Sequence, residues 1–368
     1  MTNQFVLSNV LHRPMRALVS VMAISLEVVM ILMVVGVSSG MVADSANRQQ
    51  GIGADIFLQP PNASVIFSTG GAVMPISDKT VIEKIEGIRA VAPMLTQLET
   101  EGQLVTLSGI DYESYNDVSG GLTFLAGGPF SAPNASEMIV DDLQQKADRL
   151  KIGDTREFHG QKFKVCGVVK HGKGARILVP LLTLQELVGA TGKASMMLIK
   201  CSRPDQVSEV IRQIETALPS YGVFSVQDWV TRIVNTRLPP LDALIQVVVG
   251  VAVVIGTFAI FLSMYTTIAE RTRDIGILKS LGASKSYIVN VILRESILIS
   301  LIGLVLGILL TLAGKALILG LFPTQQVLLS AAWIWRTAIL VIISGVLGAI
   351  YPALKASSKD PLLALAYE

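Results

Sequence analysis

The chain has 368 residues, of which 51% are hydrophobic and only 16% are charged, and its mean hydropathy is +0.58. These values exclude an ordinary soluble globular protein. A net charge of +2 without basic clusters argues against nucleic acid as a partner. The composition instead predicts a membrane protein in contact with lipids.

Four segments are long and apolar enough to span a membrane. Each contains an apolar run of roughly 18 to 27 residues, which at about 1.5 Å per residue covers a hydrocarbon core of about 30 Å. The first contains one acid, Glu27, and its length favours a retained span over a cleaved signal peptide. We place the spans at residues 18–40, 241–269, 285–318 and 335–354.

Basic residues near the spans predict the orientation of the chain. They lie before the first span, between the second and third, and after the fourth. All three segments are cytoplasmic if both termini are inside. Residues 41–240 and the loop at 319–334 then lie outside.

Residues 41–240 mix strand-like and helical patterns. Alternation predicts strands at 55–59, 103–110, 156–170, 176–180 and 195–201, and helical spacing appears at 77–88 and 205–218. A further helix near Gln227 and Asp228 leads toward the second span and is interrupted at Pro239 and Pro240. The predicted fold is an α-helical membrane protein of four transmembrane helices, with a mixed α+β extracytoplasmic domain inserted between spans 1 and 2.

Two cysteines, Cys166 and Cys201, fall in strand-like runs of this domain. A disulfide is permitted in that compartment, but two separate buried strand cysteines explain the pattern equally simply.

The inner loop, residues 270–284, predicts a short amphipathic helix. Gly282 suits the left-handed position after a helix, and Ser284 suits the cap of the next one. Apolar Ile275, Leu278 and Leu281 repeat on one side, and Gly276 lacks a side chain where a partner could approach closely. A helix lying in the lipid headgroups is the alternative interpretation.

The tail, residues 355–368, has a similar character, with Asp360 as a helix cap and Pro361 at the first helical position. A frayed tail is the alternative.

These two segments resemble the FtsX-like permeases, specifically the MacB-type ABC transporter permeases. The loop pattern Glu-Arg-x-x-acid-Ile-Gly-x-Leu-basic-x-x-Gly-Ala is matched here, and residues 1–17 resemble the cytoplasmic amphipathic helix before the first span. The resemblance implies an ATPase-coupling interface at Glu270, Arg271, Arg273, Asp274, Ile275, Gly276, Leu278, Lys279, Gly282 and Ala283. Secondary cytoplasmic contacts are expected at Arg13, Arg16, Lys355, Pro361 and Leu365.

The resemblance further implies a permease in the bacterial inner membrane, paired with a second copy of itself or a close paralogue. Its partners would be a cytoplasmic ABC ATPase dimer, which binds the ATP and Mg, and a periplasmic adaptor protein. This chain would bind no cofactor and catalyse no reaction. It would couple ATP hydrolysis to motion of its outer domain, for export or extraction of a lipoprotein, lipid, peptide or drug.

Other interpretations stay open. The outer domain could activate a cell-wall hydrolase, or the chain could be a membrane-anchored sensor without an ATPase. The glycines around Lys193 lack the spacing of a phosphate-binding loop, and three scattered histidines support neither a metal site nor a catalytic triad. Glu27, an acid in mid-span, is a candidate for a functional or structural role.

Overall fold

The computed structural model describes residues 14–61, 63, 72–99, 105–235 and 239–359. The chain divides into two compact units. The helical unit comprises Met1–Gly40, Leu238–Gly320 and Gln325–Glu368, and the outer unit comprises Met41–Arg237 and Leu321–Thr324.

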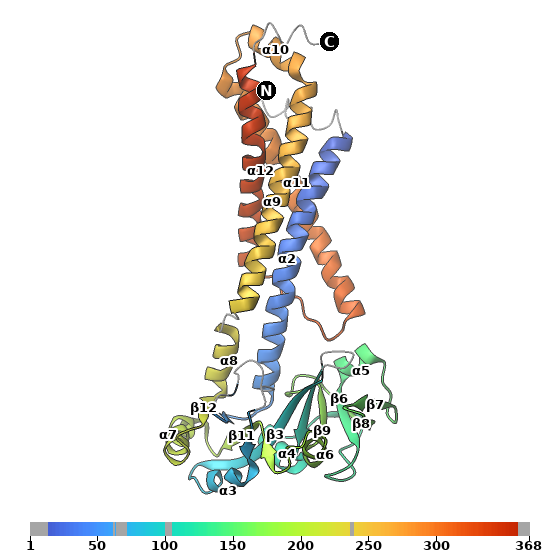
Figure 1. Ribbon diagram of the computed structural model, residues 1–368, viewed down its shortest axis with the longest axis vertical. Coiled ribbons are helices and arrows are strands. Elements are labelled where there is room, and N and C mark those ends of the chain that lie inside the picture. The colour runs from blue at the N-terminus through green and yellow to red at the C-terminus, as the bar shows by residue number, and fades with distance from the viewer. Residues whose placement is uncertain (1–13, 62, 64–71, 100–104, 236–238, 360–368) are drawn as a thin grey trace. The chain divides into compact units, whose positions relative to one another are not determined.

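Four long helices build the helical unit, and each is long and apolar enough to cross a membrane. They are α2 (Pro14–Gly51), α9 (Pro239–Glu270), α11 (Lys285–Leu321) and α12 (Ala331–Ser358), with the short α10 (Thr272–Ser280) between α9 and α11 (Figure 1). Four membrane-crossing helices are therefore confirmed. The first continues past residue 40 to Gly51, since no proline follows Pro14 within the helix.

Small residues let the long helices approach closely. A Cβ atom on Gly303 of α11 would lie 2.5 Å from Cγ2 of Ile24 in α2. A Cβ atom on Gly348 of α12 would lie 2.5 Å from the backbone oxygen of Thr257 in α9. Pro352, also buried in α12, removes the backbone N–H that would bond to the carbonyl of Gly348.

The outer unit is built on a ten-stranded mixed sheet in the order β12-β1-β11-β3-β4-β9-β6-β8-β5, with β7 paired to β8. The pairs β4–β9 and β6–β8 are parallel, and the other pairs of this sheet are antiparallel. Its strands are β1 (Ile56–Gln59), β3 (Ile88–Glu99), β4 (Val105–Ile110), β5 (Phe124–Gly127), β6 (Glu137–Asp141), β7 (Thr155–Phe158), β8 (Gln161–Val169), β9 (Ile177–Pro180), β11 (Met196–Cys201) and β12 (Gly222–Ser225). A separate pair joins β2 (Met74–Pro75) to β10 (Lys193–Ala194).

Helices cover this sheet and bury apolar side chains against it, among them Phe57, Tyr115, Phe163 and Trp229. They are η1 (Ile76–Asp78), α3 (Lys79–Ile82), α4 (Tyr112–Ser119), α5 (Asp142–Asp148), α6 (Leu181–Leu187), η2 (Pro204–Gln206), α7 (Val207–Ala217) and α8 (Val226–Asn235). The predicted mixed α+β domain between the first two spans is confirmed.

Two predicted elements of this domain differ in detail. The run at 156–170 is not one strand but the hairpin β7–β8, because His159 and Gly160 adopt positive φ angles of 48° and 78°. The helix predicted at 77–88 ends at Ile82, and Ile88 already begins β3. Gly87, with φ at 93°, separates the two elements.

The two cysteines are free, and four strands of the sheet separate β8, which holds Cys166, from β11, which holds Cys201. With neighbouring strands about 4.8 Å apart, they lie well beyond disulfide reach. Burial raises the pKa of Cys166 to about 12 and that of Cys201 to about 11. Both lie in strands, Cys201 buried and Cys166 half-buried.

Candidate coupling site

The C-terminus of α10 is fixed by local backbone geometry. At its C-terminus Gly282 takes a φ of 89°, the N–H of Gly282 donates to the carbonyl of Lys279, and the N–H of Ala283 donates to that of Leu278. This is the Schellman arrangement that the glycine predicts. Ser284 then caps α11, because its hydroxyl accepts from the N–H of Tyr287 at 3.2 Å. A tight capped turn therefore joins α10 to α11 (Figure 1).

One face of α10 binds the C-terminal end of α12. Thr272 and Gly276 are buried on this face, and Lys279 lies one turn further on. The ammonium of Lys279 donates to the carbonyl of Ser357 at 2.9 Å and to that of Lys359. In return, the ammonium of Lys359 lies 3.0 Å from the hydroxyl of Thr272. These bonds satisfy carbonyls at the end of α12 that have no partner within the helix.

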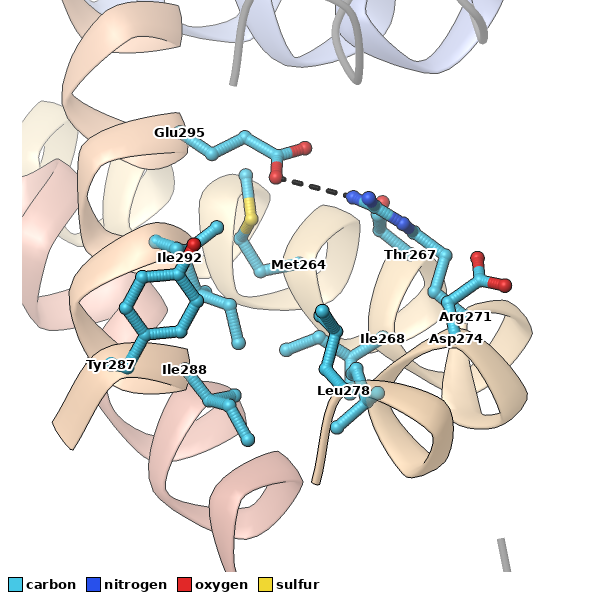
Figure 2. Close-up of a pocket in the computed structure, with 12 residues that line it drawn as sticks. Met264, Thr267, Ile268, Arg271, Asp274, Leu278, Tyr287, Ile288, Ile292 and Glu295 are labelled. Atoms are coloured by element: carbon cyan, nitrogen blue, oxygen red, sulfur yellow. Dashed lines mark hydrogen bonds and ion pairs between the residues drawn. The ribbon is translucent and has the colours of Figure 1, made fainter. Parts of the chain in front are cut away.

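A second face, carrying Ile275 and Leu278, lines a cavity of about 50 Å³ against α9 and α11. Figure 2 shows Arg271 and Glu295 at one side of this cavity, joined by an ion pair of 3.3 Å. The two side chains are 20% and 8% exposed. The pair ties the start of α10 to α11, so the helix is held on both sides.

The remaining face points away from the chain, and we call it the outward face. Leu281 is 80% exposed and Ile277 is 44% exposed, so this face carries two exposed apolar side chains outside the membrane-spanning helices. Charged and polar groups surround them. The outward face consists of Arg273, Asp274, Ile277, Ser280 and Leu281.

The ten predicted interface residues therefore fall into groups with different roles. Gly276 is buried against the chain itself, so the expectation that it admits a partner is wrong. Leu281 does not share a face with Ile275 and Leu278, because the helix ends at Ser280 and the chain turns there. Only three predicted residues are exposed along this segment before the turn: Glu270, Arg273 and Asp274.

The predicted secondary contacts are only partly described. Arg13, Pro361 and Leu365 lie outside the described residues, as does the side chain of Arg16. Lys355 reaches α9, where its ammonium lies 3.3 Å from the hydroxyl of Tyr265. The mid-span acid Glu27 is buried in the helical unit.

Several contributing residues were not predicted, namely Thr272, Glu295 and Ser357. Glu295 had a usable signal, since it directly precedes the charge-free run from Ser296 to Gly314. An acid at such a position requires a polar or basic partner. The backbone partner at Ser357 had no signal, because carbonyls look alike at every position of a sequence.

A second ionic cluster, which we call the outer junction, lies in the outer unit. The guanidinium of Arg176 contacts Asp141 at 3.0 Å, Asp44 at 2.9 Å and the carbonyl of Thr324 at 3.0 Å. Asp44 also pairs with Arg48 at 3.0 Å. Burial raises the pKa of Asp141, although the charge of Arg176 opposes this shift. The end of α2, the β8–β9 loop and the loop after α11 are thus joined.

The family model for the MacB-like periplasmic core domain matches residues 17–217, and the model for the FtsX-like permease C-terminal domain matches residues 247–361. The chain belongs to the family of MacB-type, FtsX-like ABC transporter permeases. The outward face lies within the part matched by the second model.

An uncharacterized ABC transporter permease of Bacillus subtilis, YknZ, is 25% identical over 98% of this chain and 98% of its own. The macrolide export ATP-binding/permease protein MacB of Mannheimia succiniciproducens is 24% identical over 99% of this chain, which spans 60% of that protein. The crystal structure of the periplasmic region of MacB from Actinobacillus actinomycetemcomitans is 18% identical, with a TM-score of 0.41, and covers 50% of this chain and 95% of that one. The chain thus spans nearly all of YknZ but less than two thirds of the MacB relative.

Proposed function

We propose that this permease couples ATP hydrolysis by a separate cytoplasmic ATPase to motion of its extracytoplasmic domain. The observation that carries the proposal is the outward face of α10. Apolar Ile277 and Leu281 are exposed there on a helix that Arg271, Thr272 and Lys279 hold against three other helices. A helix held in this way moves its neighbours when it is pushed.

The relatives support a separate ATPase. MacB is named as a protein that both binds ATP and is a permease, and this chain spans 60% of it. YknZ, which this chain spans almost completely, is named as a permease alone. We propose an ATPase dimer that binds two copies of this chain, with both termini of each copy in the cytoplasm of a bacterial inner membrane.

The substrate side belongs to the same proposal. By analogy with the macrolide export relatives, the outer domain would handle a drug. The proposal extends to a peptide, lipid or lipoprotein and to a periplasmic adaptor as a further partner. If a cell-wall hydrolase is recovered with the outer domain in place of an adaptor, the regulator function takes precedence.

The test is capture of the candidate ATPase by the full chain in lipid nanodiscs. Leu281→Glu should weaken ATPase binding by about tenfold or more, as expected for a central apolar contact of an interface. Leu125→Glu is the matched control, because Leu125 is 58% exposed in the outer unit and should leave binding unchanged. Equal capture by all three proteins would overturn the proposal and favour a helix that lies in the headgroups.

A further inference from the structure

The mid-span acid Glu27 sits where α2 meets two other helices. It is 2% exposed and makes no ion pair within the described part of the chain. Each of its carboxyl oxygens lies 3.2 Å from the hydroxyl of Ser344 in α12. A Cβ atom on Gly256 of α9 would lie 1.8 Å from Oε2. The carboxyl group therefore fills a notch that exists because α9 has a glycine there.

Two further polar contacts of α2 lie on either side of Glu27 along the helix. Toward its start, the hydroxyl of Ser20 lies 2.5 Å from that of Ser263 in α9. Toward its end, the carbonyl of Gly36 accepts from the N–H of Leu328 at 2.9 Å. Glu27 differs from both because it contacts α9 and α12 at one point.

The hydrogen-bond donors at this point can be counted. The hydroxyl of Ser344 has one hydrogen, yet it also lies 3.0 Å from the carbonyl of Val341. An ionised carboxylate would be a buried charge with only this hydrogen, shared with Val341, to stabilise it among the described residues, and that is costly in an apolar interior. With a neutral carboxyl group, Glu27 donates to Ser344 and Ser344 donates to Val341, so each hydroxyl hydrogen has an acceptor.

We propose that Glu27 is a positioning residue whose neutral carboxyl group latches α2 to α9 and α12. The helix α9 leads into α10, and α2 continues to Gly51 in the outer unit. The latch makes α2 follow α9 and α12 when α10 is displaced. This coupling role rests on the proposed function, whereas the latch itself does not.

The notch is tested by a double-mutant cycle on the full chain in detergent micelles. Gly256→Ala should shift the unfolding equilibrium toward the unfolded state by about tenfold when Glu27 is present, because an overpacked site is strained. In a Glu27→Ala background, the same substitution should shift it less than about twofold. An equal shift in both backgrounds would overturn the latch.

The neutral state of the carboxyl group is tested by the conservative variant. Glu27→Gln should unfold like the wild type, while Glu27→Leu should shift the equilibrium by roughly threefold to fifteenfold, the usual range for a hydrogen bond in a membrane protein. Infrared spectra should show a protonated carboxyl C=O stretch that Glu27→Gln removes. A Gln variant as unstable as the Leu variant, or a spectrum without that band, would overturn the neutral latch.

The coupling role is tested in a separate experiment, which follows a probe in the outer unit while the candidate ATPase is bound. Glu27→Leu should capture as much ATPase as the wild type but lose at least half of the ATP-dependent signal change of a probe on Leu125→Cys. An unchanged signal would overturn the coupling role. Failure of the wild type to bind any ATPase would overturn the proposed function, while the cycle at Gly256 would still decide the latch.

Discussion

The outer junction and the inner end of α10 both use arginines to join helices, but they are built differently. In the outer junction, Arg176 is 13% exposed and contacts two carboxylates and a carbonyl, with Asp141 only 4% exposed. At the inner end, Arg271 makes one ion pair, to Glu295, and is 20% exposed. The first cluster joins several charged groups and is mostly buried, and the second is the ion pair of Arg271 and Glu295 at the edge of a cavity.

This difference teaches that the two regions serve different mechanical purposes. A buried network is lost as a whole when one member is removed, because the remaining charges stay desolvated. A pair with one partly exposed member, such as Arg271, opens at a lower cost than a network of several buried charges, because water can solvate the exposed member. We therefore interpret the outer junction as a fixed clamp and the inner end as a tie that can adjust.

The largest expected effect on stability comes from removing the arginine of the outer junction. Arg176→Met leaves Asp44 and Asp141 buried beside each other, and should lower the free energy of unfolding by about 3 to 5 kcal/mol. The measurement is urea unfolding in detergent, followed by the fluorescence of buried Trp229 with Trp333 and Trp335 replaced by Phe.

The control for this change is Arg212→Met. Arg212 pairs with Glu209 on the surface and is 73% exposed. Arg212→Met should therefore lower the free energy of unfolding by less than about 1 kcal/mol. Equal losses for the two variants would show that the outer junction is no clamp.

A smaller effect is expected from Gly51→Ala, also in the outer unit. A Cβ atom at this position would lie 1.8 Å from the carbonyl oxygen of Gly172, so the backbone must shift. We expect a loss of about 1 to 3 kcal/mol in the free energy of unfolding. Gly250→Ala is the matched control, since its Cβ atom meets nothing within 4 Å and helix propensity favours alanine. If Gly51→Ala is as harmless as the control, the close approach at the end of α2 is not tight.

The smallest effect on stability is expected at the inner end. Arg271→Met should lower the free energy of unfolding by about 1 to 2 kcal/mol, because it removes the basic partner of one buried carboxylate, Glu295, whereas Arg176→Met removes the partner of two. It should nevertheless reduce permease-dependent ATPase stimulation, because α10 loses its tie to α11. Arg273→Met, on the outward face, provides the comparison for thermal unfolding. A stability loss as large as that of Arg176→Met would remove the distinction between the two regions.

The sequence predicted features that depend on neighbouring residues. The turn at Gly282 and the cap at Ser284 follow from backbone geometry within a few positions, and both are confirmed. The four apolar helices follow equally from local composition.

Features that depend on distant residues were not predictable in the same way. Gly276 and Lys279 read as partner-facing because nothing nearby marks the end of α12, about 80 residues later, as their neighbour. The notch at Gly256 is another example, because an isolated glycine in a span does not reveal which side chain fills it. Such contacts can be identified only from the packed structure of the helices.

Pro352 marks the point at which α12 bends most easily. Because the helix lacks one backbone hydrogen bond there, bending at this point needs less energy than elsewhere along α12. The carbonyl of Ser357, which accepts from Lys279, lies beyond the proline, whereas Gly348, which touches α9, lies before it. The last turns of α12, which bind α10, can therefore tilt relative to the part of the helix before Pro352.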